Sequence, residues 1–144
     1  MASVSTYLNF ADQKEEAFLF YQSILGGEFI GEISRFGDMP PAEGMPLLSQ
    51  KENQLVMHMA MPLMGNHVLM GSDAPQCLGF QVNPGNNVHI NLELDSREES
   101  DRIFNSLSAG GNISMPLQDM FWGDYFGSFR DKFGVDWMIN CSTK

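Results

Sequence analysis

The sequence predicts an α+β fold in which two strand–helix–three-strand (βαβββ) modules follow one another in a single domain, 1–144. The first observation is internal repetition: residues 12–17 resemble residues 95–100, and the glycine pair at 26–27 corresponds to the pair at 110–111, at an offset of 83 or 84. The second is that the hydrophobic pattern changes from alternating to helical and back in both halves. We place module one at about 4–72 and module two at about 86–141.

Each module begins with a strand and a helix. Residues 7–10 and 88–94 alternate apolar and polar side chains, which is typical of half-buried strands. An acidic residue, Asp12 or Asp95, precedes each helix, and apolar residues then recur at helical spacing. The glycine pairs end both helices, because glycine readily adopts the left-handed conformation that a helix terminus often needs.

The remaining strands follow each helix. In module one, residues 54–61 and 66–71 predict a hairpin with its turn at 64–66. In module two the predicted strands are 112–116, 125–130 and 135–141, with residues 131–134 as the last turn. Residues 36–50 contain three prolines and indicate a long irregular loop, which is either a binding loop or disordered at its tip.

Composition limits the classes of function. A chain of 144 residues, 43% of them hydrophobic, suits one buried core. Its net charge of -10 disfavours nucleic acid and anionic membranes as partners. No apolar run approaches the ~20 residues of a membrane span, and we expect a cytoplasmic protein. Cys77 and Cys141 lie in no CxxC arrangement and indicate thiols rather than a disulfide or a zinc site.

Motifs along nearly the whole chain point to one family. They lie at residues 7–10, 16–17, 20–21, 25–28, 70–73, 107, 110–111, 121–123 and 131–140. With these motifs the chain resembles the glyoxalase, bleomycin-resistance and extradiol-dioxygenase (vicinal oxygen chelate) superfamily, and within it the PhnB-like branch, often labelled a 3-demethylubiquinone-9 3-methyltransferase-like domain. The resemblance implies a cup-shaped mixed β-sheet with helices packed outside, a small-molecule cavity in the cup, and a homodimer.

The sequence indicates no cofactor and no metal. The strand-to-helix turns at 11–13 and 95–97 lack the glycines on which a nucleotide-derived methyl donor usually lies. Metal-dependent members of the family bind their ion on the first and last strands of each module. The matching positions here are Ser5 or Thr6, Leu69, His89 and Met138. Only His89 is a weak candidate metal ligand, and one donor does not hold a divalent ion.

Candidate ligand-binding residues lie on the predicted strands and beside the last hairpins. If His89 faces inward, alternation places Asn91 and Glu93 on the same face, as a polar strip or as a solvated surface. Aromatic residues at 121–126 would form either a pocket wall, core packing or a dimer contact. The candidate set is His58, His89, Asn91, Glu93, Phe121, Trp122 and Tyr125.

Two functions remain, and the catalytic residues stay unassigned. The first is a metal-free protein that binds a small, partly aromatic or polar molecule. The second is a lyase-, isomerase- or dioxygenase-like enzyme that uses the same cavity, with a shifted metal site or an acid–base group drawn from His58, His89 and Glu93. We favour the binding protein.

Overall fold

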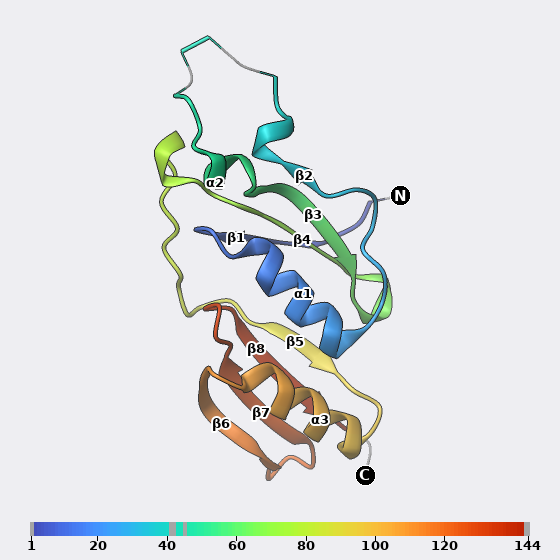
Figure 1. The fold of residues 1–144 in the computed structure, drawn as a ribbon. Coiled ribbons are helices and arrows are strands. Elements are labelled where there is room, and N and C mark those ends of the chain that lie inside the picture. The colour runs from blue at the N-terminus through green and yellow to red at the C-terminus, as the bar shows by residue number, and fades with distance from the viewer. Residues whose placement is uncertain (1, 41–42, 45, 143–144) are drawn as a thin grey trace. The chain divides into compact units, whose positions relative to one another are not determined.

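The protein is a tandem of two units, each built on one four-stranded sheet. The structure, a computed structural model, describes residues 2–40, 43–44 and 46–142, so parts of the predicted loop 36–50 lie outside the described residues. The chain divides into unit one, Met1–Asn83, and unit two, Pro84–Lys144. Both units follow the order βαβββ (Figure 1), so the predicted α+β class and the duplicated module are confirmed.

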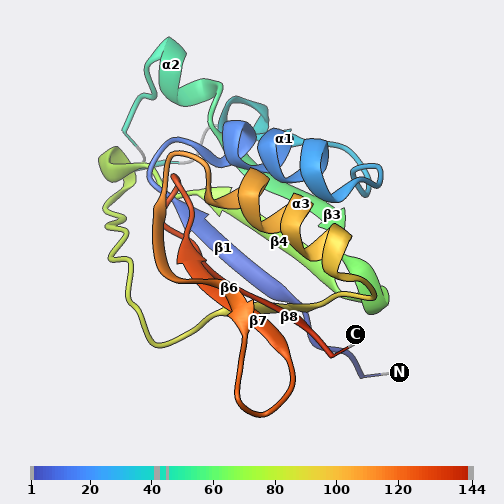
Figure 2. The same cartoon turned by 90° about the horizontal axis from the view of Figure 1, so that it is seen from below.

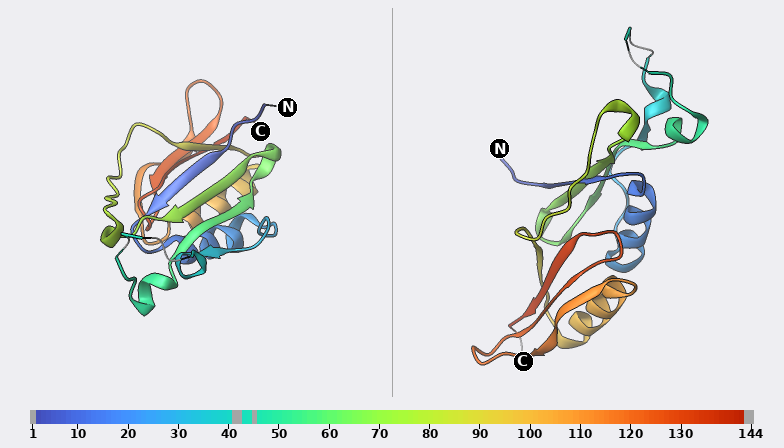
Figure 3. Two further views of the ribbon diagram at one scale, coloured as in Figure 1. Left: turned by 90° about the horizontal axis from the view of Figure 1, so that it is seen from above. Right: turned by 90° about the vertical axis from the view of Figure 1, so that its left-hand side faces the viewer.

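Unit one has the strand order β1–β4–β3–β2, in which β1 and β4 are parallel and the other pairs antiparallel. Helix α1 (Lys14–Leu25) covers one face of this sheet, as the edge-on view in Figure 3 shows. The helix buries Ala17, Phe18 and Tyr21 on its sheet-facing side. The four strands are β1 (Thr6–Phe10), β2 (Ser34–Arg35), β3 (Val56–Pro62) and β4 (Val68–Asp73).

Unit two repeats this topology with the strand order β5–β8–β7–β6, and β5 and β8 are again parallel. Helix α3 (Arg97–Ser108) lies across one face of the sheet, and the hairpin that joins β6 to β7 projects beyond it (Figure 2). The core between helix and sheet contains Ile103, Phe104, Leu107, Phe129, Trp137 and Ile139. The strands are β5 (Ile90–Glu93), β6 (Asn112–Asp119), β7 (Tyr125–Arg130) and β8 (Asp136–Cys141).

Helices α1 and α3 begin two residues after Asp12 and Asp95, which were predicted to start them, and end close to the predicted glycine pairs. The side-chain oxygen of Ser96 accepts the N–H of Glu99 and caps α3, whereas the Asp73 carboxylate from β4 accepts the Lys14 N–H at the start of α1. Gly26 and Gly110 follow the two helices with φ of 79° and 78°, a conformation that side chains rarely adopt.

The irregular segments contain short elements that the sequence did not predict. Within 36–50 and just after it lie a 3₁₀ turn, η1 (Phe36–Asp38), and helix α2 (Gln50–Asn53), which Ser49 and Glu52 cap reciprocally. The 3₁₀ turn η2 (Met64–Asn66) forms the predicted hairpin turn, and η3 (Gln76–Leu78) follows β4. Strand β5 begins at Ile90, two residues later than predicted.

Two further findings concern the described residues as a whole. No helix among them has the length and apolar character that crossing a membrane requires. Cys77 is exposed and Cys141 is buried, and neither forms a disulfide within the described ranges.

Candidate functional site

The open face of unit two, the side of its sheet away from α3, carries a group of polar side chains. Strand register places Asn91 opposite Met138 and Glu93 opposite Asn140. Residues opposite one another point to the same side of a sheet, and alternate residues along a strand share that side. Asn91, Glu93, Met138 and Asn140 therefore lie together, while Trp137 and Ile139 pack toward α3.

A chain of hydrogen bonds fixes two carboxylates on this face. The amide nitrogen of Asn140 donates to Glu93 Oε2 and to Asp124 Oδ2, both at 3.0 Å. The amide nitrogen of Asn91 donates to the other Glu93 oxygen, Oε1, at 3.2 Å. Each carboxylate oxygen has about two lone pairs, so both groups keep the capacity to accept donors from a bound molecule.

Aromatic rings continue this face at the β6–β7 hairpin. Phe126 lies opposite Asn140 in register. The centroids of the Trp122 and Phe126 rings are 6.3 Å apart. Phe121 packs edge-on against Trp122 with a centroid distance of 4.9 Å. Phe121 and Trp122 are 97% and 51% exposed. Exposed aromatic surface beside fixed acceptors suits an organic molecule with a planar part and polar groups.

Tyr125 lies on the opposite side of the sheet from this group. It pairs with buried Cys141, and its hydroxyl donates to the Asp101 carboxylate on α3 at 2.5 Å. The guanidinium of Arg97 stacks 4.0 Å above the Tyr125 ring and forms a two-bond ion pair with Asp119. The hydrogen bond to Asp101 raises the pKa of Tyr125. Tyr125 thus belongs to the contact between α3 and the sheet.

None of the three histidines takes part in the hydrogen bonds of the polar group. His89 is exposed and precedes β5, so it is not part of the strand that carries Asn91 and Glu93. His58 lies in unit one on β3, opposite Ser34 and 6.2 Å from the Tyr7 ring. The His67 ring is hydrogen-bonded to the Thr6 hydroxyl at 2.7 Å.

The open face presents two carboxylates, those of Glu93 and Asp124, as possible donors to a metal ion. The Asn140 amide bridges Glu93 and Asp124, and the adjacent Met138 offers only a thioether. In unit one Leu69 is fully buried, and Met70, opposite Tyr7, has the open-side position instead. Within the described ranges no three His, Cys, Asp or Glu side chains are placed to share an ion.

Three contributors to the site were absent from the predicted set: Asn140, Asp124 and Phe126. Asn140 lies on an alternating strand, and the signal for it was that it shares one side of β8 with Asp136 and Met138. Asp124 and Phe126 lie inside the aromatic stretch that the sequence singled out. Asn140 meets Phe126 through the pairing of β7 with β8 and Glu93 through the pairing of β5 with β8, and a local pattern specifies neither register.

Comparisons with known proteins agree with this architecture. The family model described as Glyoxalase/Bleomycin resistance protein/Dioxygenase superfamily matches residues 5–139. Protein YjdN of Escherichia coli (strain K12) is 38% identical, covering 95% of this chain and 93% of that protein. The solved structure of PA1353 from Pseudomonas aeruginosa is 34% identical with a TM-score of 0.83, and 100% of each chain is covered. A PhnB protein from Bacillus cereus is 26% identical with a TM-score of 0.75, covering 97% of this chain and 99% of that one.

Proposed function

The chain belongs to the glyoxalase/bleomycin resistance protein/dioxygenase superfamily, and from that premise we propose that it binds a small organic molecule on the open face of unit two. The observation that carries the proposal is the placement of Asn140, whose single amide nitrogen holds the Glu93 and Asp124 carboxylates in fixed positions. Acceptors that are already ordered lose little entropy when a ligand binds. The site is therefore suited to recognition.

The chemistry of the face defines the ligand class. Glu93 and Asp124 present acceptors, so the ligand carries at least two hydrogen-bond donors. Trp122 and Phe126 present ring surface next to these acceptors, so the ligand also has a planar, partly aromatic body. A neutral molecule with both features matches this face better than an anion, because both carboxylates would repel negative charge.

We propose binding without a metal in preference to metal-dependent catalysis. The support is the small donor set: two carboxylates, a methionine as the neighbouring side chain on β8, and no third His, Cys, Asp or Glu placed to share an ion with them among the described residues. For methyl transfer, neither strand-to-helix turn supplies the glycine-rich bend that a nucleotide-derived donor needs. Elemental analysis after chelator dialysis and reconstitution tests this point. About one tightly held metal per chain, lost in His89→Ala, would favour the enzyme alternative instead.

A calorimetric screen with site variants tests the binding proposal. The compounds are neutral planar molecules with donors, such as catechol, 4-hydroxybenzamide and 2-aminopyrimidine. Glu93→Gln keeps the shape of the side chain but removes its charge, and we expect about tenfold weaker binding because hydrogen bonds to charged groups contribute ~1.5 to 3 kcal/mol. Glu98→Gln, on the exposed side of α3, is the matched control and should bind normally. Equal affinity of Glu93→Gln and the parent protein would exclude this face.

A further inference from the structure

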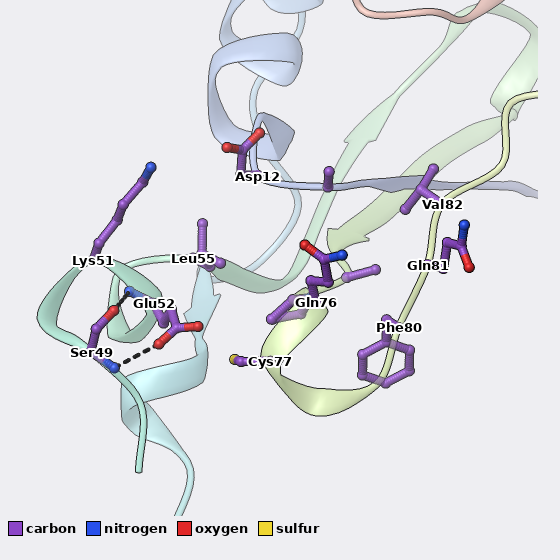
Figure 4. A pocket seen from close by; sticks show the side chains of 13 residues that line it. Asp12, Ser49, Lys51, Glu52, Leu55, Gln76, Cys77, Phe80, Gln81 and Val82 are labelled. Atoms are coloured by element: carbon purple, nitrogen blue, oxygen red, sulfur yellow. Dashed lines mark hydrogen bonds between the residues drawn. The ribbon is translucent and has the colours of Figure 1, made fainter. Parts of the chain in front are cut away.

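Unit one contains a cavity of its own, of about 820 Å³, which the proposed function does not use. Figure 4 shows its walls: the turn between β1 and α1, helix α2, and the segment that follows β4 through η3. The volume falls in the range of about 300 to 1,000 Å³ that is usual for small-molecule sites. The cavity is thus large enough for a small organic ligand.

Two carboxylates on the cavity wall carry negative charge. Asp12 is exposed in the β1–α1 turn, and its carboxylate has no hydrogen bond or ion pair with another described residue. The Glu52 carboxylate accepts the thiol hydrogen of Cys77 and the N–H of Ser49, and these bonds lower the pKa of Glu52. The same contact raises the pKa of Cys77, so the thiol stays neutral and the charge remains on Glu52.

Nearby basic groups leave this charge largely uncompensated. Lys14 follows the Asp12 turn, but burial lowers its pKa to about 6, so the amine is mostly uncharged at neutral pH. The Arg35 guanidinium is engaged in a two-bond ion pair with Glu15. Lys51 is the cationic group on the wall, and its side chain extends away from those of Gln76 and Cys77 (Figure 4). The cavity therefore attracts positive charge.

The wall also contains apolar side chains and an exposed aromatic ring, beside the polar side chains of Ser49, Gln76 and Gln81. Phe80 is 51% exposed, and Leu55 and Val82 line the same cavity. A ring face attracts alkylammonium and guanidinium groups, and the effect adds to that of a neighbouring carboxylate. We propose that this cavity binds a small organic cation, a substituted ammonium or guanidinium group on a compact apolar body. Asp12 and Glu52 would hold the charge, and Phe80 would cover the body.

Calorimetry with benzylammonium tests the proposal, with benzyl alcohol and benzoate as neutral and anionic analogues of the same size. We expect benzylammonium to bind and the two analogues to bind at least tenfold more weakly. Asp12→Asn should weaken benzylammonium binding about fivefold, and Lys51→Gln should strengthen it about twofold, because charges in a partly exposed site contribute about 1 kcal/mol or less. Phe80→Leu should weaken it through loss of the ring.

Three results would overturn the proposal. One is the absence of benzylammonium binding up to about 10 mM. Another is equal binding of benzyl alcohol, since the cavity would then select only the apolar body. The third is unchanged affinity in Asp12→Asn, provided that the thermal midpoint shows the variant to be folded.

Backbone amide shifts in ¹H–¹⁵N spectra separate this site from that of unit two. Benzylammonium should shift amides near Asp12, Glu52 and Cys77, and Glu93→Gln should leave its affinity unchanged. Shifts confined to unit two would refute the cation site and leave the proposal for unit two standing. Conversely, a loss of neutral-ligand binding in Glu93→Gln concerns the site of unit two alone and leaves the expected affinity of unit one for benzylammonium unchanged.

Discussion

The indole N–H of Trp137 donates a 2.8 Å hydrogen bond to the Asp131 carboxylate, and both side chains are buried. The other oxygen of Asp131 accepts the backbone N–H groups of Phe133 and Val135 at 2.8 and 3.0 Å. One carboxylate thus closes the turn between β7 and β8 and orients the largest buried side chain of unit two. We therefore expect the stability of the unit that carries the proposed site to depend on this contact.

Replacing Asp131 with Asn should lower the free energy of unfolding by about 2 to 4 kcal/mol, because an amide group offers one acceptor oxygen to three N–H donors. Urea unfolding measures the change. Trp137→Phe supplies the second arm of a double-mutant cycle, and we expect a coupling energy of about 1 kcal/mol or more between the two positions. Strictly additive effects would show that the hydrogen bond contributes nothing.

The buried Lys14 predicts an unusual pH dependence of stability. Its amine lies against the Phe18 ring and has no hydrogen-bond partner in the described part of the chain. Gly71 leaves room for it, because a Cβ there would lie 2.7 Å from Lys14 Cε. Desolvation lowers the pKa of Lys14 from 10.5 to about 6, partly opposed by the charge of Asp73.

Between pH 6 and 10.5 the unfolded chain therefore binds more protons at Lys14 than the folded chain does. Stability should rise with pH across this window, by at most ~1.4 kcal/mol for each pH unit. Lys14→Met should be more stable than the parent at pH 7. Its stability should also lack the rise with pH that Lys14 causes in the parent. Urea unfolding of both proteins at several pH values gives the difference curve, with exposed Lys51→Met as control. A difference curve without slope would mean that Lys14 is charged in the folded state.

Gly134 lies in the turn between β7 and β8 and has a φ of 90°. A Cβ at this position would meet no atom within 4 Å. A substitution therefore costs backbone strain without a clash. We expect Gly134→Val to lower the free energy of unfolding by ~1 to 3 kcal/mol. Gly134→Asn should lower it less, because Asn tolerates positive φ better than a β-branched residue does. Thermal midpoints of the two variants test this order. Equal midpoints in the variants and the parent would show that the turn imposes no strain.

The sequence was sufficient for the long elements because both copies of the module carry the same periodic signals. Strand β2 was missed because its two residues, Ser34 and Arg35, have no period, and its register against β3 is irregular. Similarly, α2 has only four residues and depends on its Ser49–Glu52 cap. Elements of this length form through contacts that a local pattern does not contain.

The site was predictable only in part. Alternation correctly placed Asn91 and Glu93 on one exposed face, because that is a property of a single strand. Asn140 joins them through the register of β5 against β8, which is a non-local property. Tyr125 and Phe126 are adjacent on β7 and point to opposite sides, so the aromatic stretch divides between the α3 contact and the open face.

We also expect a homodimer, since strands at the sheet edges expose groups that favour pairing. Edge strand β6 exposes Ile113 and Met115, at 53% and 37%. Light scattering at micromolar concentration should give about twice the chain mass of 16.1 kDa. Ile113→Lys should shift the mass toward the monomer if β6 lies in the interface. A parent protein near 16.1 kDa would contradict the expectation.

Fluorine NMR of protein labelled with 5-fluorotryptophan tests the central claim most directly. The chain has two tryptophans: Trp122 is 51% exposed beside the polar face, and Trp137 is fully buried against α3. Trp122→Phe assigns the two resonances. A compound found by calorimetry, such as catechol, should move the Trp122 resonance saturably and leave that of Trp137 in place, and Glu93→Gln should remove the effect. A compound that binds by calorimetry while the Trp122 resonance stays fixed would contradict the account.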